Sequence, residues 1–600
     1  MKMFKLKRII SVLLCIMMAV AIVGCQSKPT ESKGPELFKA GTYKVSADGH
    51  NGDITVEVTV DKYEIKEIKV LSHKESPNIT DAAIERMPKA IVNDQTLAVD
   101  AIAGATVTSN AIIAAVTEAL KLAGADISAL SIRKDREAVI GETTEYTTDV
   151  VVIGGGGAGL AAAVSAHQNG VKVIVLEKMP RLGGNTILSG GAFNAASSPR
   201  QVAQGIEDSV DKHFTQTYEG GDKLGNPELI RTLVENAYPA VEWLESLGMK
   251  FNAEVFTVLG GLWPRAHKPS SPLGTGFIET YQNYINSNEG IEVLLDTEAL
   301  ELIVVEGKIT GVKAKGLKGE VIVNANNGVV LATGGFGANS KMVEQYNKSW
   351  PSLANVKTTN HPGATGDGLR MGEAVGANLI GLENLQLLPL GDPKTGSLSG
   401  NIEQGVENRI FVNKSGNRFV DEGARRDVMT KALLQQEDSF LWIVLDSINY
   451  PTPETRNNFN ETIEELIAQG RAFKGDTLEE LAGKINVDPK NLVKSVEEFN
   501  KAVKSGGPDE FGRTLFDAPI EKGPFYAAPR VPTIHHTMGG IEINKYAQVL
   551  NKSGEVIPGL YAAGEVTGGI HGSNRLGGNA LADITVFGRI AGQSAAEKNS

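Results

Sequence analysis

One stretch near residue 150 constrains the fold of this chain more than any other feature. Residues 149–153 form a continuous apolar run, typical of a strand buried on both faces, and residues 154–159 (GGGGAG) lead into an alanine-rich segment. A second apolar run, residues 171–176, ends at Glu177. Glycines permit a tight turn and the close approach of a pyrophosphate to a helix N-terminus, and the acid can bind ribose hydroxyls. The order of these features predicts a dinucleotide-binding α/β domain.

The composition is that of a globular protein. Of the 600 residues 41 % are hydrophobic, and the formal net charge is −12. The acidic balance argues against a nucleic-acid partner, because phosphates require a basic surface. Cys15 and Cys25 are the only cysteines, which excludes a disulfide framework, cysteine-rich zinc sites, iron–sulfur ligation and c-type haem. No metal site is predicted.

The N-terminus has the pattern of an export signal. Four basic residues, Lys2, Lys5, Lys7 and Arg8, precede the apolar run 9–23, which is short for a membrane span but suits a secretory signal. The run ends in Ile22-Val23-Gly24-Cys25, which resembles the lipobox of bacterial lipoproteins. The resemblance implies a signal peptide at 1–24, a lipid anchor on Cys25, a tether at 25–37 and a body at the outer face of the cytoplasmic membrane. An uncleaved anchor helix is the alternative and leaves the body on the same side.

Residues 38–128 have the pattern of a small α+β domain. Strict alternation over 54–60, followed by apolar residues at 65, 68 and 70, predicts a β-hairpin, and 110–122 predicts a helix. The small-residue loop 100–109 enters that helix and is a candidate phosphate site, because free N–H groups and the helix dipole favour an anion there. A glycine turn with a Ser/Thr helix cap is the alternative.

That loop resembles the motif of FMN-binding domains to which a flavin transferase esterifies FMN. Asp100, Gly104, Ala105 and the acceptor Thr106 are in place, whereas Ala103 stands where the family usually has Ser or Thr. The resemblance implies covalent FMN on Thr106 and a flavin transferase as maturation partner. Residues 129–147 are charged and poorly patterned, and we expect them to form a linker.

Further glycine-rich motifs recur downstream. They are RLGGNT at 181–186 with SGG at 189–191, LATGG at 331–335, TGDG at 365–368 and AGEVTGG at 563–569. Together they resemble the flavoprotein subunits of the fumarate reductase and succinate dehydrogenase family, most closely the soluble flavocytochrome c fumarate reductases, over about residues 148–597. The resemblance implies non-covalent FAD, with contacts at Ala158, Glu177, Asn185, Thr186, Gly190, Gly191, Asp367, His536, Glu565, Ala580 and Leu581.

The same resemblance implies the domain order. The FAD-binding domain comprises 148–383 and 535–600, and a clamp (capping) domain at 384–534 is inserted between them. Helical patterns at 478–485 and 492–503 lie inside the insert. The expected fold class is α/β: a Rossmann-type FAD-binding domain with an inserted α+β clamp domain, plus a small N-terminal α+β FMN-binding domain.

Flavin-dependent reduction of a C=C bond needs a proton donor and positive groups that bind an activating carboxylate. By resemblance, Arg426 matches the family's acid arginine, and His535, Arg575 and Gly578 its substrate-binding residues. An arginine near acids is more often a structural ion pair, and an isolated His-His pair more often holds a metal or a cap. Glu422 or Asp427 could help to reprotonate Arg426, but the relay is left open.

Two departures from the family motif bear on the substrate. Asn401 and Ile402 stand where the family has a Thr-Glu pair, and Leu388, before Pro389, replaces a substrate histidine. Loss of polar groups should disfavour a dicarboxylate, so we expect a 2-enoate with a less polar tail, of acrylate, cinnamate or urocanate type. Fumarate is the alternative, since Glu403 or Glu407 could replace the missing acid.

Electron supply follows from what the sequence lacks. It shows no haem ligands and no pyridine-nucleotide site beyond the FAD fold, so FMN on Thr106 is the expected relay from a membrane or extracellular donor. Two other classes stay open: a ketosteroid-type flavin dehydrogenase, which relies on tyrosines, and a two-flavin electron carrier without a substrate.

Overall fold

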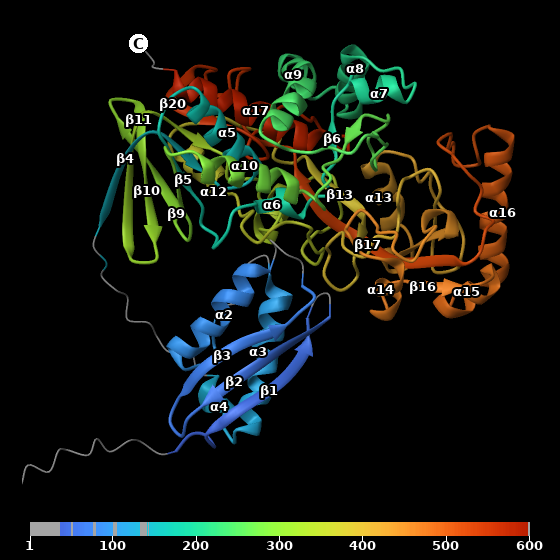
Figure 1. Ribbon diagram of the computed structural model, residues 1–600. Coiled ribbons are helices and arrows are strands. Elements are labelled where there is room, and N and C mark those ends of the chain that lie inside the picture. Colours follow the sequence, from blue (N-terminus) through green and yellow to red (C-terminus); the bar gives the residue numbers. More distant parts are fainter. Residues whose placement is uncertain are drawn as a thin grey trace, which may run out of the picture. The chain divides into compact units, whose positions relative to one another are not determined.

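The computed structural model describes residues 36–49, 52–75, 80–99, 102, 105–131, 141 and 143–597. Cys25, Asp100, Ala103 and Gly104 lie outside the described residues, and Thr106 is described by its backbone alone. The chain divides into two compact units, Met1–Asp135 and Arg136–Ser600, and Figure 1 labels their elements. No helix of the described residues is long and apolar enough to cross a membrane.

The first unit is a three-stranded antiparallel sheet packed against helices. Its elements are β1 (Gly41–Asp48), β2 (Asp53–Val60), β3 (Ile65–Ser72), α2 (Asp81–Asp94), α3 (Thr106–Leu122) and α4 (Ile127–Leu130), with sheet order β1-β2-β3. Every second residue of β2 is buried, beginning with Ile54, which confirms the predicted hairpin. The α3 helix begins four residues before the predicted start at Asn110. Strand β1 and helix α2 were not predicted.

The second unit is built on an eight-stranded sheet whose central strands are parallel. Parallel pairing joins β20, β11, β4, β5 and β8 in that order, β19 pairs antiparallel at one edge, and β9 and β10 continue antiparallel from β11. The strands are β4 (Thr144–Ile153), β5 (Val173–Leu176), β8 (Ile291–Leu294), β9 (Glu298–Val305), β10 (Lys308–Gly316), β11 (Gly319–Leu331), β19 (Gln548–Leu550) and β20 (Val556–Ala562). The predicted dinucleotide-binding architecture is confirmed.

Strand β4 begins inside the segment expected to be a linker. Its first residues, from Thr144 to Thr148, pair in parallel with Val321–Ala325 of β11. Backbone hydrogen bonds hold this part, and most of its polar side chains are exposed or half-buried, so hydrophobic patterning gives no signal there. The linker prediction was therefore wrong for residues 144–147.

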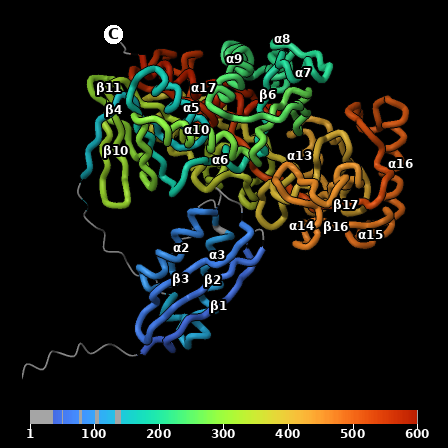
Figure 2. The backbone as a smooth tube through the Cα atoms, in the orientation of Figure 1, coloured from blue at the N-terminus to red at the C-terminus, as the bar shows by residue number. Residues whose placement is uncertain are grey.

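Two helices from opposite ends of this unit pack tightly against each other. Helix α5 (Gly157–Gln168) follows the glycine turn, and α17 (Asn579–Ala596) lies beside it, as the tube in Figure 2 shows. A Cβ at Gly592 would lie 2.1 Å from the carbonyl oxygen of Ala162, so only glycine allows this approach. The C-terminal helix thus closes one face of the sheet directly behind the glycine turn.

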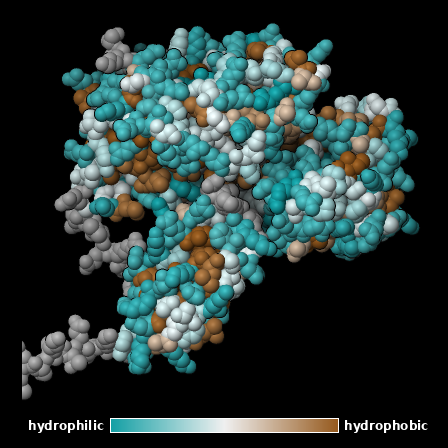
Figure 3. All heavy atoms as spheres, viewed as in Figure 1, coloured by the Kyte–Doolittle hydropathy of each residue, from teal (hydrophilic) through white to brown (hydrophobic). Residues whose placement is uncertain are grey.

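The remaining elements outside residues 384–534 surround this core. They are α6 (Gly184–Leu188), β6 (Phe193–Asn194), α7 (Pro199–Ala203), α8 (Val210–Gly220), α9 (Pro227–Ser246), β7 (Ala266–His267), α10 (Thr275–Ser287), α11 (Ser340–Tyr346), α12 (Asp367–Ala374), β12 (Leu379–Ile380) and β18 (Gly540–Ile541). The visible face of the second unit in Figure 3 is mainly hydrophilic, as expected for a globular chain with its apolar residues inside.

Residues 384–534, called the clamp segment below, contribute most of a second, antiparallel sheet. Its order is β13-β17-β15-β14, with β16 beside β17. The elements are β13 (Leu385–Gly391), β14 (Ile410–Val412), α13 (Arg426–Leu434), η1 (Glu437–Ser439), β15 (Leu441–Asp446), η2 (Ser447–Asn449), α14 (Ile463–Ala468), β16 (Phe473–Gly475), α15 (Leu478–Ile485), α16 (Pro489–Ser505) and β17 (Phe525–Thr537). The two helices predicted in this segment are confirmed, and α16 starts earlier because Asp488 caps it.

Buried histidines should make this unit acid-sensitive. Burial lowers the pKa of His213 from 6.5 to about 3, and its Nε2 lies 3.0 Å from Asn579 Oδ1. The folded state therefore keeps His213 neutral between those pH values, whereas the unfolded state binds a proton, so the free energy of unfolding falls as the pH drops below 6.5. Urea unfolding at about pH 7.5 and about pH 5 should show a pH-dependent loss smaller by about 2 kcal/mol in His213→Gln than in wild type. Equal losses in the two proteins would contradict the assignment.

Candidate FAD pocket and active site

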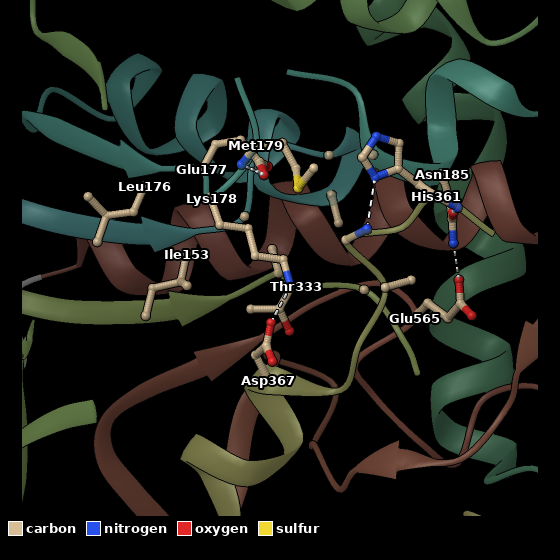
Figure 4. Close-up of a pocket in the computed structure, with 18 of the residues that line it drawn as sticks. Ile153, Leu176, Glu177, Lys178, Met179, Asn185, Thr333, His361, Asp367 and Glu565 are labelled. Carbon is tan, nitrogen blue, oxygen red and sulfur yellow. Dashed lines mark hydrogen bonds and ion pairs between the residues drawn. The ribbon is translucent and has the colours of Figure 1, made fainter. Parts of the chain in front are cut away.

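A deep pocket opens at the carboxyl ends of the parallel strands. The residues that end or follow β4, β5, β11 and β20 line it: Ile153, Glu177, Thr333 and Glu565 among them (Figure 4). It encloses about 860 Å³ of empty space, including open solvent at its mouth. Ligands of parallel α/β sheets bind at this edge, since the loops that follow the strands meet there.

Three helix N-termini face this pocket without a side-chain cap. The first residues of α5, α6 and α12 line it, and none of these helices has a capping side chain. Uncapped N–H groups and the helix dipoles favour an anion. A Cβ at Gly156 would meet nothing nearer than the carbonyl oxygen of Gly183 at 4.0 Å. Packing of the protein therefore does not require glycine at this position, and the missing side chain leaves space in the pocket. These features fit the pyrophosphate of a dinucleotide.

Glu177 stands where the ribose-binding acid is expected. Its carboxylate accepts hydrogen bonds from the backbone N–H of Gly155 (2.7 Å) and Met179 (2.8 Å). Burial raises the pKa of Glu177 in spite of these bonds, which act in the opposite direction. The next residue, Lys178, forms an ion pair with Asp367 and donates to Thr365 Oγ1 at 2.7 Å, so the acid and the cation from one strand end are both held in place.

A second group of polar side chains brings together residues far apart in the chain. Arg426 is the first residue of α13, His535 lies near the end of β17, and Arg575 lies in the loop before α17. Arg426 is 6 % exposed and Arg575 3 %, and His535 is half-buried. Burial lowers the pKa of His535 and that of Arg426; both arginines add to the effect on His535, and Arg575 adds to the effect on Arg426. The three groups therefore form one electrostatic cluster.

Gln386 of β13 joins the two arginines. Its Oε1 accepts from Arg426 Nη1 (3.1 Å), and its Nε2 donates to the carbonyl oxygen of Arg575 (2.8 Å). Arg426 Nε also donates to the carbonyl oxygen of Leu259 at 3.0 Å. These bonds fix the plane of the Arg426 guanidinium between the clamp segment and the rest of the unit.

The cluster carries more positive than negative charge. Burial lowers the pKa of Arg575 to about 10, and burial together with Arg575 lowers that of Arg426 well below 12.5. Arg575 Nε is buried without a hydrogen-bond partner. His536 follows His535 and lies 4.0 Å from Glu565 of the pocket wall, so the cluster adjoins the dinucleotide pocket. Such a site is suited to a carboxylate.

Comparison with known proteins decides between the flavin families. The FAD-binding domain model matches residues 149–581, and the FMN-binding domain model matches residues 49–121. The chain belongs to the FAD-dependent fumarate reductase and flavocytochrome c family. This confirms the resemblance seen in the sequence, and the chain combines an FAD-binding domain with an FMN-binding domain.

Two relatives and one solved structure illustrate the likeness. The chain is 41 % identical to the NADH:acrylate oxidoreductase of Vibrio harveyi over 94 % of its own length, and spans only about three fifths (62 %) of that protein. It is 37 % identical to the urocanate reductase of Eggerthella lenta, with 96 % of each chain covered. The open conformation of a flavocytochrome c3 fumarate reductase matches with 36 % identity and a TM-score of 0.61, covering 75 % of this chain and 78 % of that one.

The expected FAD contacts of this flavoprotein fall into two groups. Those lining the pocket are Ala158, Glu177, Asn185, Thr186, Asp367 and Glu565, whereas Gly190, Gly191, His536, Ala580 and Leu581 are not among its lining residues. Helix α17 lines it through Ile584 instead. The predicted FAD contacts did not include Lys178, His361 and Thr333, and the buried hydroxyl of Thr333 has no hydrogen-bond partner among the described residues. The available signals were the position of Lys178 next to the acid and that of Thr333 inside the glycine-rich motif 331–335.

The acids suggested as proton helpers lie elsewhere. Glu422 is fully buried between Arg418 and Arg513, at 2.7 Å from a guanidinium nitrogen of each, and Asp427 pairs with Arg425. Glu403 instead forms a buried ion pair with Arg409 and is the carboxylate that raises the pKa of Arg426. Glu422 and Asp427 are thus held by other arginines, and Glu403 is the acid that acts electrostatically on Arg426; the role of Glu422 or Asp427 in reprotonation stays a prediction.

The opposite side of Arg426 is apolar. Leu388 and Ile402 belong to one buried cluster with Leu259, Val406 and Met429, and the Leu259 carbonyl is the one that binds Arg426. The two residues that replace polar groups of the family motif thus pack together. His535 and His536 lie in no group of three metal-ligating side chains among the described residues, so the structure gives no support to a metal pair there.

The expected flavin acceptor begins a helix in the first unit. Helix α3 starts at Thr106 and has no side-chain cap at its N-terminus. Two residues on, the hydroxyl of Thr108 donates to the buried carboxylate of Glu75, which ties this end of α3 to the segment that follows β3. The start of α3 at Thr106 fits a phosphoester held at a helix N-terminus.

The glycine turn gives a direct test of the FAD pocket. Gly156→Val should reduce FAD affinity about 10-fold or more, because the added Cβ points into pocket space and meets no protein atom nearer than 4.0 Å. The measurement is the amount of FAD bound per protein, with circular dichroism to show an intact fold. Gly483→Val, which also points into open space, is the matched control, and equal FAD binding by both variants would contradict the assignment.

Proposed function

We propose that this flavoprotein reduces the C=C bond of an α,β-unsaturated carboxylate with a less polar tail, of acrylate, cinnamate or urocanate type. The observation that carries the proposal is the pair of buried arginines, Arg426 and Arg575, joined through Gln386 beside the FAD pocket. Neither guanidinium forms an ion pair with a carboxylate among the described residues. The names of two relatives, an acrylate oxidoreductase and a urocanate reductase, support the substrate class.

In this proposal, residues of the chain bind the substrate carboxylate and donate the proton. Arg575 and His535, with Gly578 at the start of α17, bind the substrate carboxylate and draw charge onto it. When bound, reduced FAD supplies a hydride to one alkene carbon. Arg426 donates a proton to the neighbouring carbon, which completes the addition of two electrons and two hydrogens. Its lowered pKa makes the guanidinium a stronger acid than a free arginine.

The proton must then return to Arg426. Glu403 is 6 % exposed, acts electrostatically on Arg426 and is bonded to Arg409. We assign Glu403 and Arg409 as the route by which solvent protons reach the donor. The electrostatic effect of Glu403 on Arg426 also supports the alternative function, fumarate reduction, because it places an acid near the cluster that could replace the acid missing from the family motif.

Substrate choice is tested by reoxidation of the anaerobically reduced holoprotein. Acrylate, cinnamate or urocanate should oxidise the flavin at least about 10-fold faster than fumarate, because the apolar cluster around Leu388 leaves a second carboxylate without partners. A preference for fumarate would support the alternative, and no reoxidation by any unsaturated acid would contradict the enzymatic proposal.

Arg426→Gln identifies the proton donor in the same assay. The variant should lose about 10²- to 10⁴-fold in turnover while it keeps its FAD. Arg200→Gln is the control, because Arg200 pairs with Glu245 outside the cluster. Full turnover in Arg426→Gln would remove this residue from the mechanism.

We also propose that the protein is exported, lipid-anchored at Cys25 on the outer face of the cytoplasmic membrane, and matured by a flavin transferase. The sequence pattern of residues 1–25 supports the anchor, and the FMN-binding domain supports the attachment of FMN to Thr106. That FMN would receive electrons from a membrane or extracellular donor.

Thr106→Val tests the attachment. The variant should lose covalent FMN and reduction by a membrane donor, because valine offers no hydroxyl for the ester, and it should keep turnover with a strong artificial reductant. Thr117→Val, also on α3, is the control. Covalent flavin in Thr106→Val, detected by mass spectrometry, would place the attachment elsewhere.

A further inference from the structure

The residue directly before the proton donor bridges two parts of the second unit. Arg425 precedes α13, and its guanidinium binds Asp222 with a two-pronged contact: Nη1 to Oδ1 at 2.6 Å and Nη2 to Oδ2 at 2.9 Å. Asp222 lies in the loop after α8, outside the clamp segment. The remaining Arg425 contacts are to Asp427 of α13, at 2.9 and 3.2 Å.

Asp222 is in turn attached to the loop that carries Arg575. Ser573 donates its hydroxyl to Asp222 Oδ2 and its N–H to the carbonyl oxygen of Gly221 at 3.1 Å. Asn574 donates to the carbonyl oxygen of Gly220 at 3.0 Å. One carboxylate therefore receives hydrogen bonds both from the residue before Arg426 and from a residue two positions before Arg575.

The backbone at this carboxylate is constrained. Asp222 and Lys223 both have positive φ, +56° and +62°, a conformation that costs a non-glycine residue energy unless its surroundings impose it. Arg425 is the main reason that the pKa of Asp222 is lowered to about 2. The carboxylate is thus charged at any physiological pH and held towards Arg425.

The cluster needs such a bridge because its two arginines repel each other. Arg426 and Arg575 are both buried, and Arg575 lowers the pKa of Arg426. Glu403 opposes this repulsion at Arg426, and Glu565 and Asp583 oppose it at Arg575. None of these carboxylates forms an ion pair with either guanidinium among the described residues, and the neutral Gln386 offers only hydrogen bonds. A bound substrate carboxylate would remove much of the repulsion.

We infer that Arg425, Asp222 and Ser573 form a positioning bridge that holds the substrate-free site closed between Arg426 and Arg575. The inference rests on the proposed function. Loss of the bridge lowers the fraction of protein whose site is closed and ready to bind substrate. The apparent affinity for substrate falls in proportion to this fraction. At saturating substrate the bound carboxylate closes the site, so turnover is retained.

The test is Asp222→Asn, since asparagine tolerates positive φ and keeps a partner for Ser573 while it removes the charge. KM for the best enoate should rise about 3- to 10-fold with kcat within about twofold. Arg425→Gln should raise KM by a similar factor. Arg425→Lys should raise KM less than Arg425→Gln, because lysine keeps the positive charge. Asp211→Asn, which removes a surface pair with Arg231, is the control and should leave KM unchanged.

Salt and hydrogen exchange separate this role from a merely structural one. The Arg425 and Asp222 side chains are 25 % and 51 % exposed, so added salt should raise KM more in wild type than in Asp222→Asn. In the holoprotein without substrate, amide exchange in α13 should be faster in Asp222→Asn, and propionate, an unreducible carboxylate, should suppress it.

The exchange readout is independent of turnover, so failure of the proposed reduction and failure of the bridge are distinguishable. A change in KM no larger in Asp222→Asn than in Asp211→Asn, or equal exchange in α13 of wild type and Asp222→Asn, would overturn the inference.

Discussion

Two like charges buried within one cluster set the main constraint on the second unit. Arg426 and Arg575 come from segments on either side of the clamp segment boundary, and each is almost completely removed from water. Burying a guanidinium without an ion-paired carboxylate is unfavourable, and the mutual repulsion of the two arginines adds to the cost. Under the proposed function a ligand carboxylate would complete this arrangement, so the site would be better matched to a bound anion than to the free state.

The fold supplies the parts of this cluster from elements whose positions are fixed by pairing. Strands β13 and β17 run antiparallel, with Gln386 opposite His536 and Leu387 opposite Ile534, so the strand pair holds the glutamine and the two histidines near one another. Arg575 lies just before α17, whose packing against α5 fixes it relative to the glycine turn. The strand pairing and the helix packing that build the core therefore place the arginine–histidine cluster next to the FAD pocket.

How far the sequence predicted this arrangement depends on whether the signal is local. The strand, turn and acid from residue 149 to Glu177 and the helix α15 were predicted because burial periodicity is carried by neighbouring residues. The start of β4 at Thr144 was missed because only its backbone pairs there. Gln386 gave a weak signal as a polar residue inside the apolar run of β13, all of which is buried.

The acids near Arg426 show more clearly what could not be predicted from the sequence. Glu422 and Asp427 are neighbours of Arg426 in sequence, yet their carboxylates bind Arg418, Arg513 and Arg425. Glu403, from an earlier segment of the chain, is the acid that acts electrostatically on Arg426. Asp222 has no sequence signal for its role, since its partner Arg425 is some two hundred residues away. Long-range pairing of charged side chains is set by tertiary packing, and no periodicity reports it.

Two buried arginines of the clamp segment, Arg418 and Arg426, differ in the charges that surround them. Arg418 is surrounded by Glu422 and Asp509, and their charges raise its pKa. A guanidinium so compensated holds its proton more firmly and cannot act as an acid. The pKa of Arg426, equally buried, is lowered mainly by burial and further by Arg575, whereas Glu403 acts in the opposite direction. Burial alone does not distinguish Arg418 from Arg426, but the sign of the strongest neighbouring charge does, and it supports the proposal that Arg426 is the proton donor.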